Sequence, residues 1–243
     1  MLKPAIDLIG RERCSGCFAC LSSCPENAIT MQLDNYGFYV PSIDRQACDQ
    51  CGVCSTFCPV VSHEEKTNEA IAPKAFAAWS LDDQRRMESS SGGIFSELAA
   101  PILENGGVVF ACVWGEGMLP RHIPITNMAG LQLARGSKYV QSHIGDAYKQ
   151  VIELSEDKEV LFVGTPCQAA AMRRFRRKNN ANEILIADLV CHGTASMKAF
   201  HSYLQFLFNG DKVQQINFRD KTNGWKNYRL NALSASGKIY DRK

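Results

Sequence analysis

Short apolar runs alternate with amphipathic stretches from residue 75 onward. Helical spacing of apolar residues predicts three helices, and β-rich apolar runs predict six strands. Strands that alternate with helices favour an α/β sheet. The expected helices span 92–105, 168–178 and 196–208, and the expected strands span 75–80, 108–113, 159–163, 184–190, 213–218 and 228–233.

The helix expected over 92–105 carries its own boundary signals. Ser91 is the expected N-cap, Pro101 is expected to kink the helix, and Gly106 with Gly107 ends it. A Ser-Gly turn that enters a helix also offers free amides and a positive dipole end, which suit a phosphate. From these residues alone, a plain N-cap and a phosphate site both stay open.

Residues 10–60 lack this periodicity and contain an internal repeat instead. The segment from Cys14 to Pro25 recurs 34 residues later as Cys48 to Pro59. Asn35-Tyr36-Gly37, between the two copies, predicts the tip of a hairpin. Polar residues follow the second copy and indicate a linker. We therefore expect a domain at 1–62, a linker at 63–74 and a second domain at 75–243.

Charge supports this division into two modules. Residues 1–70 carry nine acidic and five basic residues, a net charge of −4, whereas residues 71–243 carry 16 acidic and 22 basic residues, a net charge of +6. Two modules of opposite sign are expected to dock on each other. The near balance of the whole chain argues against a nucleic-acid partner.

The N-terminus and the apolar runs predict where the protein resides. Residues 1–13 lack the sustained apolar region of a signal peptide. The longest apolar run, 108–114, is too short to span a bilayer. We expect a cytoplasmic protein without a membrane span, in which eleven cysteines indicate metal binding or catalysis rather than disulfides.

The spacing of eight cysteines predicts two [4Fe–4S] clusters. Each copy of the repeat reads Cys-x-x-Cys-x-x-Cys-x-x-x-Cys-Pro, and in two-cluster ferredoxins with such runs the fourth cysteine binds the other cluster. Structural zinc is the alternative, but it usually uses two separated cysteine pairs. The region resembles the bacterial 2[4Fe–4S] ferredoxin family at every ligand position. The expected ligands are Cys14, Cys17, Cys20 and Cys58 for cluster I, and Cys48, Cys51, Cys54 and Cys24 for cluster II.

Two further cysteines lie on expected strand-to-helix turns. Cys167 follows the strand at 159–163, and Cys191 follows the strand at 184–190. Ligands of open α/β sheets bind at the carboxyl ends of the strands, so both cysteines are expected at one rim. The alternative is a pair of buried free cysteines. Cys112 lies inside an apolar run and is expected in the core.

Five motifs in order resemble the family of coenzyme F420 hydrogenase/dehydrogenase beta subunits. They are the segments 89–95, 136–142, 162–168 and 188–193, and Phe218-Arg219-Asp220-Lys221 with Gly224-Trp225. The resemblance implies an α/β flavin-binding-type domain after an α+β, ferredoxin-like module. It also implies FAD as the converter between two-electron and one-electron transfer, with F420 or ferredoxin as redox partner. Cofactor contacts are assigned to Ser91, Gly92, Gly93, Ser137, Lys138, Tyr139, Gln141, Thr165 and Pro166.

The resemblance further implies a third [4Fe–4S] cluster with Cys167 and Cys191 among its ligands. Its other ligands are expected in a cysteine-rich stretch after Gly224-Trp225, which this sequence does not contain. We therefore expect either a truncated second domain, the absence of this cluster, or its completion by a partner chain. Whether the protein forms an oligomer stays open.

Several polar residues allow two interpretations each. The basic run at 173–178 is either a solvated helix end or a docking site for an acidic partner. His192 is the candidate catalytic residue, as a proton donor, or it stabilises a turn. Lys138 either contacts a cofactor phosphate or is exposed. Trp79, Trp114 and Trp225 are expected in the core or at its edge rather than stacked on a flavin.

Two functions follow from these features. The first is an iron–sulfur flavoprotein oxidoreductase that passes electrons between two clusters and a flavin. The alternative is a non-catalytic electron-transfer protein that serves a partner enzyme. The sequence does not identify the substrate.

Overall fold

The computed structural model describes residues 2–61, 74–181 and 183–242, and its chain divides into two compact units. Unit 1 comprises residues 1–77 and 144–191, and unit 2 comprises 78–143 and 192–243. The cysteine-rich segment therefore clusters with part of the expected second domain. The expected linker, 63–74, falls almost entirely outside the described residues, and the expected domain boundaries stay a prediction.

The N-terminal part of unit 1 is a small α+β module built around the expected hairpin. Strands β1 and β2 pair antiparallel, with Leu33 opposite Tyr39, so the turn contains the predicted Asn35-Tyr36-Gly37 tip. Asp34 fixes this turn because its carboxylate accepts hydrogen bonds from the amides of Tyr36 and Phe38. The elements are α1 (Ala5–Ile9), α2 (Ala19–Ser23), β1 (Ile29–Leu33), β2 (Tyr39–Ile43) and α3 (Val53–Phe57).

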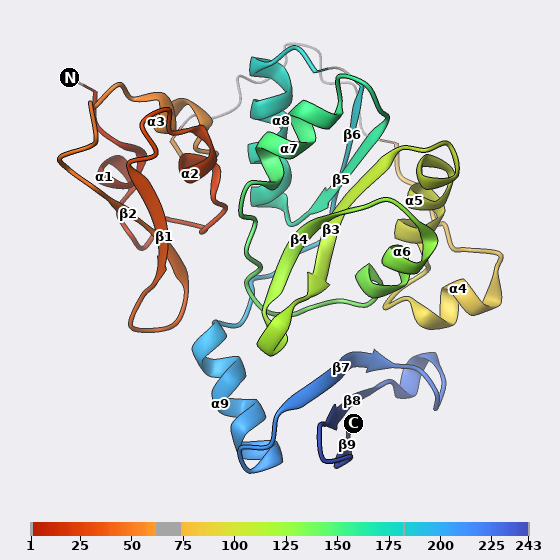
Figure 1. Cartoon of the computed structure of the whole chain (residues 1–243). Coiled ribbons are helices and arrows are strands. Elements are labelled where there is room, and N and C mark those ends of the chain that lie inside the picture. The colour runs from red at the N-terminus through yellow and green to blue at the C-terminus, as the bar shows by residue number, and fades with distance from the viewer. Residues whose placement is uncertain (1, 62–73, 182, 243) are drawn as a thin grey trace. The chain divides into compact units, whose positions relative to one another are not determined.

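The remainder of unit 1 is a β-α-β arrangement that carries two of the expected turns. Strand β5 pairs parallel with β6, with Gly164 opposite Asp188, and α8 connects them. The side chains of β5 are buried throughout, which explains its apolar run. Figure 1 shows α7 and α8 beside these strands. The elements are α7 (Ala147–Leu154), β5 (Val160–Gly164), α8 (Pro166–Lys178) and β6 (Ile184–Asp188).

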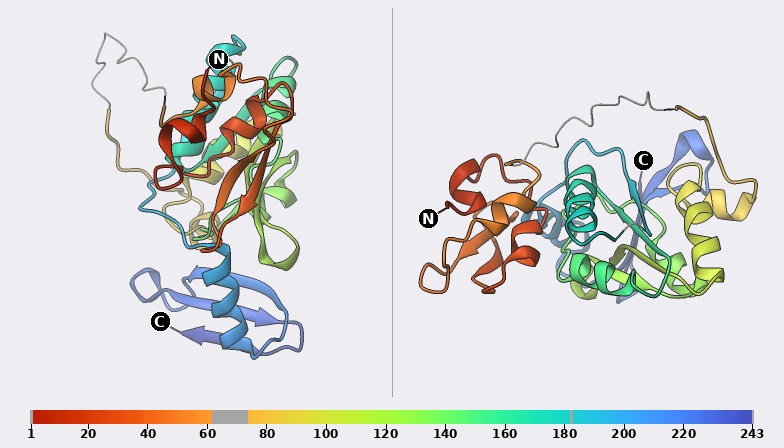
Figure 2. Two further views of the ribbon diagram at one scale, coloured as in Figure 1. Left: turned by 90° about the vertical axis from the view of Figure 1, so that its left-hand side faces the viewer. Right: turned by 90° about the horizontal axis from the view of Figure 1, so that it is seen from above.

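Unit 2 contains two sets of antiparallel strands. β3 pairs with β4, and β7, β8 and β9 form a meander. Helix α9 lies along the meander in the left view of Figure 2. The Phe200 ring of α9 contacts Phe218, and the Phe208 ring contacts Tyr240. The elements are α4 (Asp83–Glu88), α5 (Ile94–Glu104), β3 (Val108–Trp114), η1 (Glu116–Met118), β4 (Pro120–Ile125), α6 (Met128–Ala134), α9 (Met197–Phe208), β7 (Val213–Asp220), η2 (Trp225–Asn227), β8 (Arg229–Ser234) and β9 (Ile239–Arg242).

Two local predictions were wrong. Residues 75–80 form no strand, because they are mostly exposed. Among the backbone hydrogen bonds between described residues, only the Ser80 amide of this segment donates, to the Gly92 carbonyl. Helix α5 begins at Ile94, and its N-cap is Gly93 in the left-handed region rather than Ser91. Pro101 lies inside α5 as expected. The fold is therefore mixed α/β, with a parallel pair in unit 1 and antiparallel pairs in unit 2.

In the ranges that the structure describes, no helix is long and apolar enough to cross a membrane. The expected cytoplasmic location stays a prediction.

Candidate iron–sulfur and cofactor sites

The two cysteine runs fold into the same local structure. Each run contains a five-residue helix, α2 or α3, just before its last cysteine. The N-cap residue of each helix adopts the left-handed conformation. The N-cap is Phe18 in the first run, with φ 67°, and Gly52 in the second, with φ 75°. These caps are 34 residues apart, so the sequence repeat is also a repeat in backbone conformation. The bulky Phe18 tolerates this unfavourable region because it is buried.

Each short helix separates the third cysteine from the fourth. Cys20 lies in the first turn of α2, and Cys24 is its extended C-cap residue; Cys54 and Cys58 occupy the same places in α3. Four residues of helix correspond to roughly 6 Å along the axis. A proline then favours the extended conformation of the fourth cysteine. This geometry suits a fourth cysteine that binds a different cluster from the first three.

A pocket in the N-terminal module brings together thiols from both runs. Cys14, Cys17 and Cys20 line it from the first run, and Cys58 lines it from the second. These are the four cysteines assigned to cluster I. The rest of the lining is mainly apolar and includes Ala5, Ile6, Ile9, Met31 and Val60. The donor set and the apolar wall both fit a [4Fe–4S] cluster.

Two of the four ligands assigned to cluster II, Cys54 and Cys24, lie beside residues of this pocket. The Cys54 sulfur accepts a hydrogen bond from the Ala5 amide at 3.4 Å. Cys54 and Cys58 belong to one group of buried, packed side chains, and Cys24 packs against this group. Cys48 is half-buried and Cys51 is exposed. The two expected cluster sites thus adjoin through their third and fourth cysteines, which favours a short path for electrons.

Burial perturbs the thiols of cluster I. It raises the pKa of Cys17 to about 12 and also raises the pKa values of Cys14 and Cys20. Desolvation disfavours an isolated thiolate, and in Cys20 the neighbouring cysteine charges add to this effect. A positively charged iron centre would reverse the balance, because the bound thiolate is then paired with metal charge. In this pocket, a thiolate bound to iron is therefore favoured over a free thiolate.

Cys167 lies close enough to cluster I to interact electrostatically with Cys14 and Cys17. It occupies the first turn of α8, half-buried, with its sulfur 3.3 Å from the Thr165 hydroxyl. Thr165 is the N-cap of α8 and forms a capping box with Gln168, whose Oε1 accepts from the Thr165 amide at 2.9 Å. Pro166 is the first helical residue. These assigned cofactor contacts thus also shape the turn that presents Cys167.

Cys191 follows the end of β6 and is exposed. Because β5 and β6 are parallel neighbours, Cys167 and Cys191 follow strand ends on the same rim, as expected. The alternative of two buried cysteines was wrong for Cys191. Neighbouring His192, the candidate proton donor, is also exposed. The ligand and catalytic roles of these residues stay predictions.

Three of the five motifs meet in unit 2. The Ser137 amide donates to the Ser90 hydroxyl at 2.7 Å, which joins the segments 136–142 and 89–95. Lys221, from the fifth motif, donates from Nζ to the carbonyls of Arg86 at 2.9 Å and Ser91 at 3.2 Å. The Lys221 ammonium also lies over the Trp225 ring, 4.1 Å from its centroid. Sequence order alone gave no signal for these contacts.

The two glycines of this loop allow a close approach of the backbone. A Cβ at Gly92 would lie 3.0 Å from the Ala78 carbonyl oxygen, and a Cβ at Gly93 would lie 3.0 Å from Ser80 Cβ. Gly93 also has φ 88°, which L-residues rarely adopt. The glycines therefore pack against residues 78–80.

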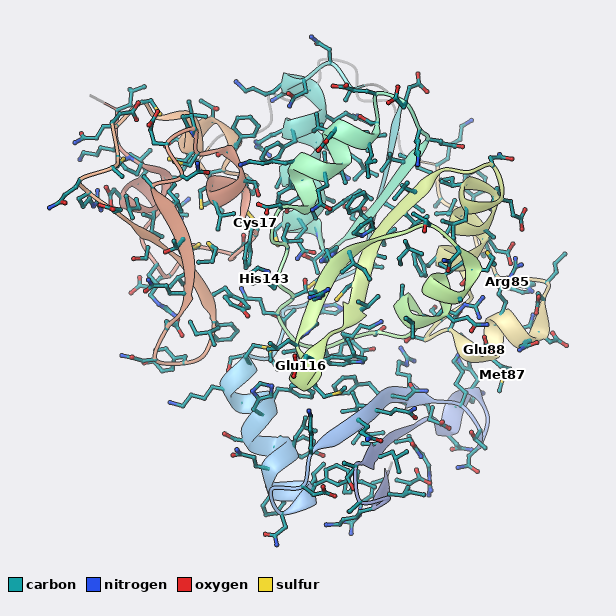
Figure 3. All side chains as sticks on the ribbon, in the orientation of Figure 1. Cys17, Arg85, Met87, Glu88, Glu116 and His143 are labelled. Atoms are coloured by element: carbon teal, nitrogen blue, oxygen red, sulfur yellow. The ribbon has the colours of Figure 1, made fainter. Side chains whose placement is uncertain are left out.

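A pocket of about 340 Å³ adjoins the joined motifs in unit 2. Its volume lies at the lower end of small-molecule sites. Arg135 is mostly buried there and pairs with Glu88, which is labelled on α4 in Figure 3, and with the Ser96 hydroxyl at 3.0 Å. The ring of Trp114 stacks on Phe200 with centroids 5.6 Å apart. The lining comprises Glu88, Trp114, Gln132, Arg135, Gly136, Ser137, Ile216 and Asn217.

The other assigned cofactor residues lie outside this lining. The Nζ of Lys138 lies within hydrogen-bonding distance, 2.9–3.3 Å, of four carbonyls at the C-terminal end of α6, those of residues 133–136, and its three N–H groups are shared among them. Its ammonium is thus engaged by the chain itself. Tyr139 is largely exposed and meets Phe218 edge-on. Gln141 is buried, and its backbone amide donates to the Ala195 carbonyl.

The basic run on α8 is not simply a solvated helix end. Arg174 is 2% exposed, and its guanidinium donates to the Ala170 carbonyl. Arg173 pairs with Asp188 at 3.2 Å, and Arg176 donates to the Ile184 carbonyl. The contacts of Arg173 and Arg176 hold α8 on β6. Cys112, expected in the core, is half-buried in β3.

The ligand loops and the joined motifs define an iron–sulfur protein with a mixed α/β domain. Three family models match the chain. One is a 4Fe–4S dicluster domain at residues 13–61, and the others are the N-term and the C terminus of the coenzyme F420 hydrogenase/dehydrogenase beta subunit, at residues 75–149 and 157–238. These last two models together span more than half of the chain. The chain belongs to the family of coenzyme F420 hydrogenase/dehydrogenase beta subunits and carries a 4Fe–4S dicluster domain.

Two curated relatives share between a quarter and a third of their aligned residues with this chain. A subunit of the F(420)H(2) dehydrogenase of Methanosarcina mazei is 27% identical over 88% of this chain and 62% of its own length. Coenzyme F420-dependent sulfite reductase of Methanocaldococcus jannaschii is 28% identical over 67% of this chain and 25% of its own length. This chain therefore spans less than two thirds of either relative.

A solved structure, the F420-reducing [NiFe] hydrogenase complex from Methanosarcina barkeri, aligns with a TM-score of 0.49 and 18% identity. The alignment covers 68% of this chain and 58% of the solved one.

Proposed function

We propose that this chain passes electrons between coenzyme F420 and two [4Fe–4S] clusters as one component of an F420-dependent oxidoreductase. The observation that carries the proposal is the pocket lined by Cys14, Cys17 and Cys20 together with Cys58. The matches to the dicluster domain and to both beta-subunit models support it, as do the names of the two F420-linked relatives. Because the dehydrogenase relative is named as a subunit, it also supports a role within a larger assembly.

The cysteines have distinct roles in this proposal. Cys14, Cys17, Cys20 and Cys58 bind cluster I, and Cys48, Cys51, Cys54 and Cys24 bind cluster II. The adjoining third and fourth cysteines bring the clusters close, so an electron can pass between them. Because Cys167 interacts with Cys14 and Cys17, cluster I is the one nearer to the rim of β5 and β6.

We propose FAD as the second cofactor, with its ring system in the 340 Å³ pocket of unit 2. Bound flavin would supply the exchange between hydride transfer and single-electron transfer. The Trp114 ring offers an apolar wall, and Arg135, held by Glu88 and Ser96, offers a fixed positive charge. The Ser90–Ser137 hydrogen bond fixes the loop beside the pocket. His192 remains a candidate proton donor, and Cys167 with Cys191 remain candidate ligands of a third cluster.

Anaerobic reconstitution of the full chain tests this function. We expect about eight irons per chain, retention of added FAD, and reduction of the clusters by reduced F420. Gln132→Trp should fill the pocket and weaken FAD binding at least tenfold. Leu133→Trp is the matched control, since Leu133 is an exposed neighbour on α6 that does not line the pocket. Equal FAD binding by both variants would refute the pocket assignment.

A second candidate function is a flavin-free electron carrier that serves a partner enzyme. It is favoured by the engagement of the Lys138 ammonium with four carbonyls and by the tight packing of Gly92 and Gly93. These groups were the expected phosphate contacts. Eight irons with no FAD retained would support the carrier and exclude the flavoprotein.

A further inference from the structure

Tyr148 is a fully buried tyrosine whose hydroxyl lies beside the ligand loop of cluster I. Its side chain is 0% exposed in unit 1, on the first turn of α7. Burial raises the pKa of its hydroxyl. Nothing in the sequence marks Tyr148, because its partners are distant in the chain.

The hydroxyl contacts two carbonyls, one of an expected ligand of cluster I and one of the residue after Cys167. It donates to the carbonyl of Cys17 at 2.8 Å, and it lies 3.4 Å from the carbonyl of Gln168, the residue after Cys167. A hydroxyl has one proton to donate, so the shorter contact with Cys17 is the principal hydrogen bond. Figure 3 shows Cys17 on the side of its module that faces α7. A single oxygen thus joins the ligand loop to the turn of Cys167.

The ring of Tyr148 continues this connection to the other cysteine run. It stacks on Phe175 with centroids 5.1 Å apart and an interplanar angle of 12°. Phe175 lies 4.4 Å from the ring of Phe57, which immediately precedes Cys58. The series of contacts Tyr148–Phe175–Phe57 therefore connects the segments that contain Cys17 and Cys58, two expected ligands of cluster I that lie far apart in sequence.

These contacts bear on the cluster because the potential of a [4Fe–4S] centre depends on its hydrogen bonds and solvent exposure. A buried carbonyl that loses its donor is unfavourable, so the ligand loop would move or admit water. Water near the cluster stabilises the more negatively charged reduced form and makes the potential less negative. Cluster II has no such contact with Tyr148 among the hydrogen bonds of the described residues.

We propose that Tyr148 is a positioning residue that holds the Cys14–Cys20 loop against the Cys167 turn and thereby sets the reduction potential of cluster I. The inference rests on the proposed ligation of cluster I, and not on the flavin. It concerns the redox property of one cluster and goes beyond the assignment of its ligands.

Tyr148→Phe tests the proposal in the anaerobically reconstituted full chain, because it removes the hydroxyl and keeps the ring. Tyr36→Phe is the matched control, since it makes the same change at an exposed hairpin tip of the same module. Redox titration followed by electron paramagnetic resonance resolves the two clusters. We expect a less negative potential for one cluster in Tyr148→Phe, an unchanged second cluster, and no change in Tyr36→Phe.

Selective loss of one cluster, seen as a fall from about eight to about four irons, would also support the proposal. Wild-type potentials for both clusters, or an equal shift of both, would overturn it. If Tyr148→Phe fails to fold, 4-aminophenylalanine at position 148 restores a donor on the same ring. That variant should then fold with wild-type potentials, and a shift in both of its clusters would overturn the proposal.

The proposed function and this inference fail in different ways. Wild-type chain that holds two clusters but neither binds FAD nor accepts electrons from reduced F420 contradicts the function and leaves the Tyr148 test intact. Normal reduction by F420 with wild-type potentials in Tyr148→Phe contradicts only the inference.

Discussion

Replacement of Lys221 by methionine should loosen the loop in which three sequence motifs meet. The Lys221 ammonium is buried, donates to the carbonyls of Arg86 and Ser91, and lies over Trp225. Methionine keeps most of the apolar stem but removes the donor and the charge. Two carbonyls then lose a partner that approaches from 130 residues or more away in sequence.

The magnitude follows from these contacts. A hydrogen bond from a charged donor contributes about 1.5–3 kcal/mol, and a cation–π contact contributes about 0.5–2 kcal/mol. Desolvation of the ammonium opposes these terms, and burial together with Arg219 and Arg86 lowers the pKa of Lys221. We therefore expect a net loss of about 2 kcal/mol in the free energy of local opening, which corresponds to roughly 30-fold faster exchange.

Hydrogen exchange followed by mass spectrometry measures this opening in peptides that cover residues 78–93. The Ser80 amide reports directly, because it donates to the Gly92 carbonyl at 2.7 Å. Lys226→Met is the control, as Lys226 is exposed in the same motif region. Exchange of Lys221→Met within about twofold of wild type, or equal acceleration in Lys226→Met, would refute the reasoning.

Two other substitutions test the role of Cys58 as a cluster ligand and the electrostatics of α5. Cys58→Ala should lower the iron content from about eight to about four per chain, whereas Cys112→Ala should leave it unchanged; equal iron in both variants would contradict the assignment of Cys58 as a ligand. Glu97 accepts from Ser80 at 2.6 Å and from Arg85 at 3.1 Å, contacts that lower its pKa below 4.5. Its stabilisation is therefore complete above pH 4.5 and is lost as pH falls through the lowered value. The difference in melting temperature between wild type and Glu97→Gln should shrink below about pH 4.5, and a constant difference would argue against this ion pair.

The sequence predicted those parts of the fold that depend on local pattern. The apolar runs identified β3, β5 and β6 within two residues at each end, and helical spacing identified α8 and α9. The hairpin at Asn35-Tyr36-Gly37 also follows from local turn chemistry. Helices α1, α2 and α3 were missed, since five residues are too few for a periodic signal.

The remaining features depend on contacts that no local pattern records. The N-cap at Gly93 reflects packing on residues 78–80, and the Lys221 contacts join segments far apart in the chain. Residues 75–80 have a strand-like composition but pair with no strand of the described chain. The contact between Tyr148 and Cys17 spans 131 residues, which explains why the sequence identified the expected cluster ligands but not the residue that holds their loop.

We propose that this chain carries electrons between F420 and two clusters. The most direct test of this proposal mixes reduced F420 with the anaerobically reconstituted chain in the presence of FAD, and follows the clusters by electron paramagnetic resonance. We predict that reduced F420 generates the reduced-cluster signals that dithionite generates, and that Cys58→Ala loses the signal of one cluster. Clusters that dithionite reduces but that stay oxidised with reduced F420 and FAD would contradict the account.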